Sequence, residues 1–252
     1  MIARLVALVF VAMSAIALTT PRVLAAEVDR PAIEAIIRDY LIKNPEVLEE
    51  ALNALQAKRA QEQADLQKKA VTESKDAIYN TPTDVVLGNP KGDITLVEFF
   101  DYNCGYCKRG LADIVRLIET DKNIRVVLKD YPVLGPGSIE AAAVAVALRE
   151  QLKGDAYFEF HKKLLGTRGP VGKDRALAVA REVGADIEKI NAAIEGKSVR
   201  ASLTDSLRLG DTLGISGTPS YVIGDEVVVG AVGYDSLVEK IDSMRRCGQA
   251  SC

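Results

Sequence analysis

The sequence has little of the chemistry on which many enzymes depend. Among its 252 residues there is no tryptophan and a single histidine, and aromatic side chains make up only 5%. One histidine disfavours zinc sites with several histidine ligands and Ser-His-Asp hydrolysis. His161 lies in a helical pattern, so we expect a packed or surface helix residue. The glycine-rich segments 135–137 and 166–172 lack the spacing of a phosphate-binding P-loop. A net charge of −3 with interspersed signs disfavours a nucleic-acid ligand.

Long apolar runs are absent after the first 25 residues, so we expect no later segment to span a bilayer. Residues 1–25 have the pattern of a secretory signal peptide, with Arg4 before an apolar core at residues 5–18 and small residues at 23–25. The core has about 14 residues, fewer than the roughly 20 of a membrane-spanning helix, which favours cleavage over an uncleaved anchor. We therefore expect an exported chain whose mature form begins near Ala26.

Cysteine is scarce, with four residues in two close pairs. An exported chain meets an oxidising compartment in which stable disulfides form, but two pairs are too few to staple a chain of this size. The chain must therefore be held together by burial of its apolar residues, which make up 48% of the sequence. We expect the terminal pair, Cys247 and Cys252, to close an inert disulfide. An electron-shuttling role and a soft-metal site are the alternatives.

The other pair, Cys104 and Cys107, encloses two residues at the point where an apolar run at 96–100 gives way to an expected helix over 108–119. The unpaired N–H groups and the positive dipole end at a helix start stabilise a thiolate over a thiol. Cys104 is therefore the predicted nucleophile. Cys107, one helical turn later, is the predicted resolving thiol.

Two helical segments precede this region. The first covers residues 31–43, and the second starts at Pro45 and continues to residue 75. The two helices share an apolar stripe over residues 33–55. Residues 56–75 are rich in Ala, Gln, Glu and Lys and have few large apolar side chains, so the segment cannot form a hydrophobic core alone. We predict that residues 26–80 form an oligomerisation segment, in which the stripe meets copies of itself and the charged stretch is a helical stalk. The alternative is that the stripe folds back onto the main domain.

Residues 81–252 have the pattern of one α/β domain. Buried-type strands at 94–100 and 124–128 lie on either side of the helix that follows the cysteines, which predicts a parallel βαβ unit. The remaining expected elements are an inserted helical block at 138–213, a hairpin at 220–229 and a final helix at 234–246.

The stretch from Phe99 to Lys108, the helical insertion and the Gly-Thr-Pro-Ser-Tyr sequence at 217–221 together resemble DsbA-like thioredoxin-fold thiol:disulfide oxidoreductases. The Asn-Pro-Glu-bearing prefix at 38–55 is similar to that of ScsC-like (suppressor of copper sensitivity C) proteins of the bacterial periplasm. A Cys-x-x-Cys motif alone is weak evidence for this family. A motif that follows a buried strand and precedes a Thr-Pro pair by more than a hundred residues is strong evidence. The resemblance implies a thioredoxin-like fold with an inserted helical domain, a periplasmic location, and a redox-active disulfide of the motif's two cysteines without other cofactors.

The same resemblance implies further site residues. In thioredoxin-like proteins the proline matching Pro219 is cis, which leaves the backbone of Thr218 facing the cysteines and ready to pair with a substrate strand. The alternative is a trans proline that opens a strand. Glu98 matches a buried acid whose raised pKa allows proton transfer to the resolving thiol, and the alternative is a side chain that points to water. Lys129 could pair with Glu98 from the adjacent strand, although a solvated lysine is the simpler expectation.

Three functions compete. We assign Gly105, Tyr106, Thr218 and Pro219 to substrate binding. The Gly105-Tyr106 dipeptide is the one that DsbC-type isomerases carry between their cysteines. This similarity favours a disulfide isomerase/reductase that acts on periplasmic proteins with thiols or disulfides and is kept reduced by a membrane electron donor of the DsbD/ScsB type. The second function is a DsbA-like dithiol oxidase with a DsbB-like oxidant. The third is a copper-binding or chaperone protein whose motif cysteines hold Cu(I). The resemblance also favours a homo-oligomer, in particular a trimer.

Overall fold

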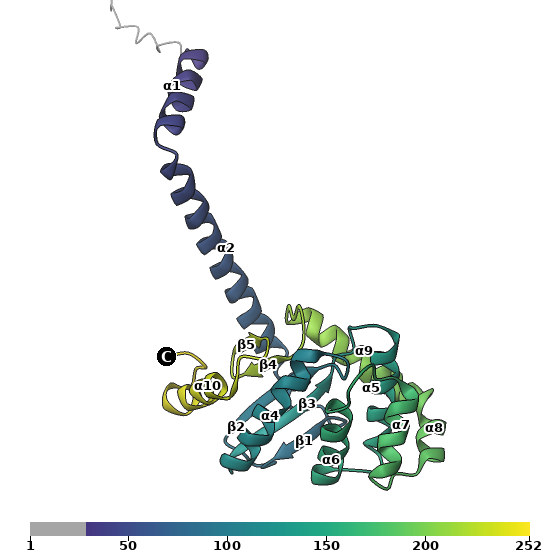
Figure 1. Cartoon of the computed structure of the whole chain (residues 1–252). Helices are drawn as coiled ribbons and strands as arrows, with labels where there is room; N and C mark the ends of the chain where they lie inside the picture. The colour runs from purple at the N-terminus through teal and green to yellow at the C-terminus, as the bar shows by residue number, and fades with distance from the viewer. Residues whose placement is uncertain (1–28) are drawn as a thin grey trace, which may run out of the picture. The chain divides into compact units, whose positions relative to one another are not determined.

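The computed structural model describes residues 29–252, so the expected signal peptide at residues 1–25 lies outside the described part of the chain. The chain divides into two compact units between Ala57 and Lys58. The first unit contains helix α1 and the beginning of α2, and the second contains the other helices and a five-stranded sheet (Figure 1). Within the described residues, no helix combines the length and the apolar character needed to cross a bilayer.

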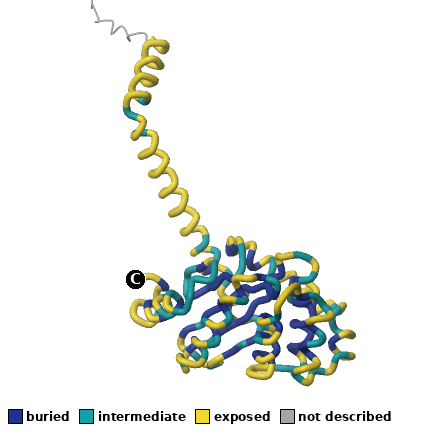
Figure 2. The backbone as a smooth tube through the Cα atoms, in the orientation of Figure 1, coloured by how far each residue is buried: buried dark blue, intermediate teal, exposed yellow. Residues whose placement is uncertain are grey.

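Helices α1 (Arg30–Lys43) and α2 (Glu46–Glu73) form from strong helix-forming residues with local caps. Asp29 caps α1, and Asn44, between the helices, donates a side-chain hydrogen bond to the carbonyl oxygen of Tyr40 at 2.8 Å. Most residues along these two helices are exposed (Figure 2), including apolar residues of the predicted stripe at 33–55. The large exposed apolar residues of this segment are Ile33, Ile36, Ile37, Tyr40, Ile42, Leu48, Leu52 and Leu55.

The C-terminal part of α2 belongs to the second unit. Val71, and Ile78 on the short helix α3 (Lys75–Tyr79), are fully buried in a hydrophobic cluster of the main domain. Gln67 adds a polar contact, because its side chain donates to the carbonyl oxygen of Leu213 at 2.9 Å. The boundary therefore falls earlier than the one expected near residue 80, since the end of the predicted stalk supplies part of the main core.

A mixed sheet forms the centre of the second unit. Its strands are β1 (Val85–Gly88), β2 (Ile94–Phe100), β3 (Ile124–Asp130), β4 (Ser220–Ile223) and β5 (Glu226–Val229), in the order β1-β3-β2-β4-β5. Strands β2 and β3 are buried along nearly their whole length and pair in parallel, with Glu98 opposite Leu128 and Phe99 opposite Lys129. Strand β4 runs antiparallel to β2 and places Tyr221 opposite Glu98. The predicted βαβ unit and hairpin are confirmed, whereas β1 was not predicted.

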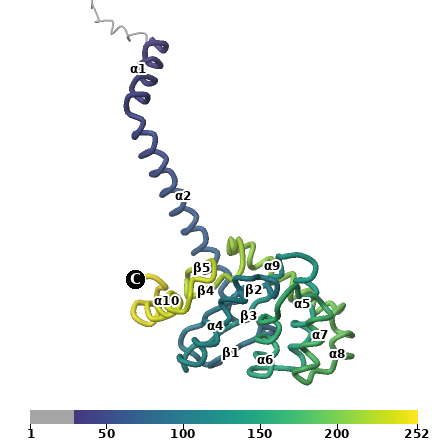
Figure 3. The backbone as a smooth tube through the Cα atoms, viewed as in Figure 1, coloured from purple at the N-terminus to yellow at the C-terminus, as the bar shows by residue number. Residues whose placement is uncertain are grey.

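The alternation of side chains along the strands divides the core into two hydrophobic clusters, one on each face of the sheet. Helices α4 (Gly105–Thr120) and α10 (Tyr234–Cys247) cover the face that carries Leu128. Helix α3 and the C-terminal part of α9 (Lys197–Thr212) cover the face that carries Phe99. The path of the chain between these layers can be followed in Figure 3.

The helical insertion lies between β3 and β4, as expected. Its helices are α5 (Pro136–Leu148), α6 (Gly154–Leu165), α7 (Lys173–Glu182), α8 (Ile187–Ile194) and α9. Helix α5 contains an Ala/Val run that is buried continuously from Ala141 to Leu148, so it forms the centre of the insertion. Pro136 in its first turn suits a helix start, because a proline there removes no intrahelical hydrogen bond.

The terminal pair Cys247 and Cys252 is a disulfide, as expected. Gly248 ends α10 in the left-handed region, with a φ of 76°, a conformation that favours glycine. Ala250, inside the small disulfide loop, is buried and joins the main hydrophobic cluster. The end of the chain is therefore attached to the domain by burial as well as by the covalent bond.

We expect Ile78→Ala to lower the free energy of unfolding by about 2–5 kcal/mol, because it leaves a cavity where α3 packs on the sheet. Ile139→Ala on α5 is the matched control, because this side chain is 49% exposed, and we expect it to cost less than about 1 kcal/mol. Urea unfolding of both variants measures the difference. Equal losses would contradict the assignment of α3 to the main core.

Candidate active site

The predicted nucleophile lies at the start of a helix. Helix α4 begins at Gly105, three residues earlier than expected, so Cys104 is its N-cap residue. Residues favoured at this position carry a side-chain oxygen that accepts hydrogen bonds from the first unpaired N–H groups. Here the position carries sulfur, and no side-chain hydrogen bond caps the helix. The predicted role of Cys104 as nucleophile depends on these N–H groups and on the helix dipole, and it stays a prediction.

Cys104 also contacts the loop that precedes β4. Its thiol donates to the carbonyl oxygen of Thr218, with 3.1 Å between Sγ and O. The peptide bond between Thr218 and Pro219 is cis, as predicted. Two segments that are 114 residues apart in the chain therefore meet at one sulfur atom.

The two residues between the cysteines face outward. Gly105 is exposed, and Tyr106 is 60% exposed with the guanidinium carbon of Arg109 4.2 Å from its ring centroid. An exposed ring and a neighbouring peptide carbonyl are groups that a polypeptide can contact. The substrate-binding roles of these two residues, and of Thr218 and Pro219, stay predictions.

Both cysteines are buried, but Cys107 more completely than Cys104, which is 6% exposed. Cys107 lies in the first turn of α4 and is fully buried. Burial raises the pKa of its thiol above the ordinary value, and the charge of Glu98 raises it further. Both Cys104 and Cys107 are free thiols in this structure. A buried thiol of this kind is poorly suited to attack an external protein, but it lies next to any mixed disulfide formed on Cys104.

Glu98 on β2 is buried, so the alternative of a side chain that points to water is wrong. Its residue is 1% exposed, and its Oε1 has no hydrogen-bond partner among the described residues. Burial raises the pKa of Glu98 to about 8, so the carboxyl is mostly uncharged at neutral pH. Such a carboxyl can exchange a proton with Cys107 near neutral pH. Its catalytic role stays a prediction.

Tyr221 is a further polar residue beside this acid. It lies opposite Glu98 on the neighbouring strand, on the same face of the sheet. Its hydroxyl approaches α4, where a Cβ built on Gly110 would come within 3.1 Å of it. Burial raises the pKa of the phenol, and the charges of Glu98 and Cys107 act in the same direction. Tyr221 belongs to the Gly-Thr-Pro-Ser-Tyr sequence at 217–221, but no role of its own was predicted for it.

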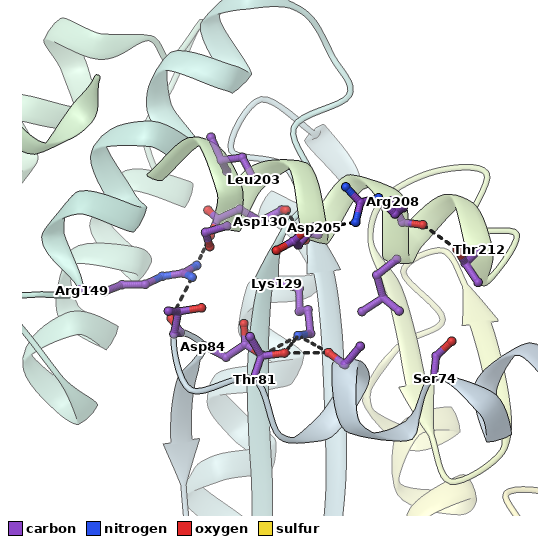
Figure 4. A pocket seen from close by; sticks show the side chains of 15 residues that line it. Ser74, Thr81, Asp84, Lys129, Asp130, Arg149, Leu203, Asp205, Arg208 and Thr212 are labelled. Atoms are coloured by element: carbon purple, nitrogen blue, oxygen red, sulfur yellow. Dashed lines mark hydrogen bonds and ion pairs between the residues drawn. The ribbon is translucent and has the colours of Figure 1, made fainter. Parts of the chain in front are cut away.

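Lys129 neither pairs with Glu98 nor lies in solvent. In the parallel register it is opposite Phe99, so its side chain points to the other face of the sheet. It is 3% exposed, and its ammonium pairs with Asp84 and donates to the carbonyl oxygen of Ala77 at 2.7 Å (Figure 4). Both expectations for Lys129 are therefore wrong, because the strand register sets its direction.

Lys129 lines a cavity of about 340 Å³ on this second face (Figure 4). Asp130 and Arg149 form another buried ion pair in its wall, and Arg149 also donates to the carbonyl oxygen of Thr83 at 3.1 Å. Ser206 donates to the carbonyl oxygen of Asp130 at 2.6 Å. These contacts join α5, α9 and the segment before β1. The buried charged side chains of the cavity form ion pairs with one another, Lys129 with Asp84 and Arg149 with Asp130. This pairing indicates that these side chains hold the surrounding segments together.

Asp101, three residues before the nucleophile, is a buried residue without a predicted role. Its carboxylate is buried and accepts hydrogen bonds from the backbone N–H groups of Asn103, Val133 and Leu134 and from the hydroxyl of Ser138, at 2.7–3.0 Å. The only available signal was a polar side chain close to a Cys-x-x-Cys motif. Val133 and Leu134 lie in the loop after β3 and Ser138 lies on α5, and their positions follow only from the fold.

His161 is a packed helix residue, one of the two outcomes expected. It is buried on α6, its Nδ1 lies 3.3 Å from the hydroxyl oxygen of Tyr102, and burial lowers its pKa to about 3. It is therefore neutral at physiological pH. Among residues 29–252, no group of three or more His, Cys, Asp and Glu side chains is arranged to hold a metal ion.

Two family models match the chain. Residues 95–242 match the DSBA-like thioredoxin domain, and residues 29–62 match the copper resistance protein ScsC N-terminal domain. The chain belongs to the DsbA-like thioredoxin family. Together with the N-terminal match, this makes it a thiol-disulfide oxidoreductase of the DsbA/ScsC type.

Solved structures of DsbA-like proteins resemble the chain over most of its length. A thioredoxin-like oxidoreductase from Silicibacter pomeroyi DSS-3 is 42% identical, with a TM-score of 0.65, and the match covers 68% of this chain and 98% of that one. Proteus mirabilis ScsC in a compact conformation is 30% identical, with a TM-score of 0.65, and the match covers 86% of this chain and 98% of that one.

Curated relatives are more distant. The Na(+)/H(+) antiporter NhaA 1 of Salinispora arenicola is 24% identical over 162 residues, which are 64% of this chain, and this chain spans only 24% of that protein. Disulfide bond formation protein D of Bacillus subtilis is 24% identical over 183 residues, a match that covers 66% of this chain and 81% of that protein.

Glu98→Gln should remove a pH dependence of stability from this DsbA-like domain. The pKa of Glu98 is about 8 in the folded chain against an ordinary value of 4.5. The folded chain therefore holds a proton that the unfolded chain loses, and stability falls as the pH rises between these two values. We expect the melting temperature of Glu98→Gln, relative to wild type, to rise by roughly 5 °C or more between pH 4.5 and pH 8.

Glu239→Gln, at an exposed position of α10, is the matched control. Its melting temperature should differ from that of wild type by the same small amount at every pH. If the melting temperature of Glu98→Gln also differed from that of wild type by the same amount at every pH, the carboxyl of Glu98 would be ionised in the folded chain over the whole interval.

Proposed function

We propose that the chain catalyses thiol-disulfide exchange on exported proteins as a disulfide isomerase/reductase. The observation that carries this proposal is the asymmetry of the two cysteines. Cys104 lies at a helix start against the carbonyl oxygen of Thr218, and Cys107 is buried near Glu98. One thiol is placed to meet a substrate, and the other can act only on what its neighbour has bound.

In the first step the Cys104 thiolate attacks one sulfur of a substrate disulfide. The substrate S–S bond breaks, a bond from Cys104 to the attacked sulfur forms, and the other substrate sulfur leaves as a thiolate. In isomerisation a substrate thiolate later displaces Cys104, without net redox change. In reduction Cys107 gives its proton to the ionised fraction of Glu98 and displaces the substrate thiolate. The resulting Cys104–Cys107 disulfide receives two electrons from a membrane donor of the DsbD/ScsB type.

The isomerase/reductase direction is supported by two features of the chain. Gly105 and Tyr106, with Thr218 before the proline, are the residues that DsbC-type isomerases carry. In addition, α1 and the first turns of α2 expose an apolar stripe through which copies of the chain can associate. A homo-oligomer, which we propose to be a trimer, brings several cysteine sites to one substrate. The signal-peptide pattern of residues 1–25 supports a periplasmic location.

Cys104→Ala should abolish the reactivation of scrambled ribonuclease, because no thiol remains at the helix start. Cys107→Ala should accumulate mixed disulfides with substrate, because the resolving thiol is missing. Thiol labelling followed by gel electrophoresis measures both effects. A Cys247→Ala/Cys252→Ala double variant is the control, because these residues form a separate disulfide, and it should keep its activity.

Two outcomes would contradict the isomerase/reductase proposal. Rapid oxidation of reduced ribonuclease without reactivation of the scrambled form would identify a dithiol oxidase fed by a DsbB-like acceptor. Stoichiometric Cu(I) on the reduced chain, lost in Cys104→Ala and accompanied by no turnover, would identify a copper-binding protein.

Leu52→Asp should dissociate the proposed oligomer, because it buries a carboxylate in the apolar interface between copies. The side chain of Leu52 is exposed in the single chain, on the apolar stripe of α2. Asn53→Asp, on another face of the same helix, adds the same charge and should leave the oligomer intact. Sedimentation velocity of the mature chain measures the difference. A wild-type chain that sediments as a monomer would contradict the oligomer.

A further inference from the structure

The side chain of Asn103, the residue before the nucleophile, is bound to the helical insertion. Its Oδ1 accepts from the backbone N–H of Val171 at 2.7 Å, and its Nδ2 donates to the carbonyl oxygen of Val171 at 2.8 Å. Nδ2 also donates to the hydroxyl of Ser138 at 3.0 Å. The amide therefore pairs with both backbone groups of one residue, as a neighbouring strand does. Val171 and Ser138 are each 1% exposed, so the half-buried amide of Asn103 binds two buried partners.

A second contact holds the same part of the insertion from the other side of the cysteines. We name residues 166–172, between α6 and α7, the insertion loop. Lys108, which follows Cys107, donates from Nζ to the carbonyl oxygens of Thr167 at 2.7 Å and Gly169 at 3.3 Å. Both residues that flank the Cys-x-x-Cys motif are thus attached to the backbone of the insertion loop.

The space for this pairing depends on a glycine. A Cβ built on Gly137, in the first turn of α5, would lie 2.9 Å from the carbonyl oxygen of Val171 and 3.8 Å from Nδ2 of Asn103. The next residue, Ser138, connects the pairing to the turn before the nucleophile, because its hydroxyl donates to Asp101 at 2.7 Å. The amide, the hydroxyl and the carboxylate form one continuous chain of hydrogen bonds.

We propose that Asn103 is a positioning residue for thiol exchange, which binds the insertion loop and thereby holds the Asp101–Cys104 turn at the start of α4. The inference rests on the proposed thiol-disulfide exchange. Apart from its contact with Thr218, the position of Cys104 is fixed by its backbone, whose N–H donates to the carbonyl oxygen of Asp101 at 3.0 Å. Without the Asn103 pairing this turn can shift relative to α4, and small displacements of a reacting atom have large effects on rate.

The positioning role and a purely structural role make different predictions. If the amide only stabilised the insertion, its removal would loosen the insertion loop and leave the chemistry of the cysteines unchanged. If it positions Cys104, its removal also withdraws the N–H groups of the helix start from the thiolate. The reduced form then loses stabilisation relative to the disulfide.

The test compares Asn103→Ala with Asn191→Ala in the mature chain. Asn191 lies exposed on α8 of the same insertion, so it is a matched control. Hydrogen-deuterium exchange of the insertion loop measures how tightly the loop is held. Equilibration with glutathione and the rate of alkylation of Cys104 by iodoacetamide at pH 7 measure the positioning. For Asn103→Ala we expect faster loop exchange, slower alkylation, and a shift of about three- to tenfold toward the disulfide form.

Gly137→Ala is the second variant, for the case that Asn103→Ala does not fold. It displaces the carbonyl group of Val171 without changing a charge or Asn103 itself, and alanine suits a helix at least as well as glycine. We expect the same three changes in the same directions. Asn191→Ala should match wild type in all three measurements.

Faster loop exchange with a glutathione equilibrium and an alkylation rate within twofold of wild type would overturn the positioning role. Unchanged loop exchange in Asn103→Ala would overturn it as well, since the pairing would then not hold the loop. A wild-type chain that does not exchange with glutathione at all would instead overturn the proposed function on which the inference rests. The loop measurement on wild type and variant does not depend on that function, so the two failures are distinguishable.

Discussion

The register of β2 against its neighbours is the constraint on which the rest of the site depends. Successive residues of a strand point to opposite faces, so the pairing of Glu98 with Leu128 and Tyr221 directs its carboxyl to the face that α4 covers. A slip of one residue would exchange Glu98 with Phe99 and move the acid away from Cys107. Because β2 is buried on both faces, such a slip would also place a carboxyl in the other hydrophobic cluster. The hydrophobic core therefore determines the chemistry of the site.

Two cysteines three residues apart thereby acquire opposite properties. Cys104 is the N-cap residue of α4, just ahead of the unpaired N–H groups of the first turn, and Cys107 lies inside that turn near the buried Glu98. Burial of Glu98 without a partner for Oε1 costs free energy that the surrounding apolar packing must offset. The same burial brings the pKa of Glu98 to about 8, close to that needed by a group that takes and returns a proton near neutral pH. Stability and reactivity are therefore opposed at this residue.

Local patterns predicted the parts of this structure that local interactions decide. Strand β2 has its predicted bounds, because apolar residues mark both of its ends. Strand β3 extends two residues farther than predicted, through the charged Lys129 and Asp130, and the four residues of β1 give too short a pattern. Helix α4 was placed three residues late, because Gly105 is a weak helix former. The direction of Lys129 depends on strand register, which a single sequence does not fix. A motif predicted Cys104, but no motif marks Asn103, whose partner Val171 lies 68 residues away.

The helical insertion is part of the active site in a physical sense. Without the insertion, the turn before Cys104 would keep its own short-range hydrogen bonds and those that Asp101 accepts from Val133 and Leu134. The insertion adds Ser138 and Val171, which bind Asn103 through neutral groups in the interior. Salt weakens interactions between exposed charges strongly, but it has little effect on hydrogen bonds between neutral groups. The position of Cys104 therefore depends only weakly on ionic strength. This property suits the proposed periplasmic location, because an exported protein works in a medium whose salt content the cell does not control.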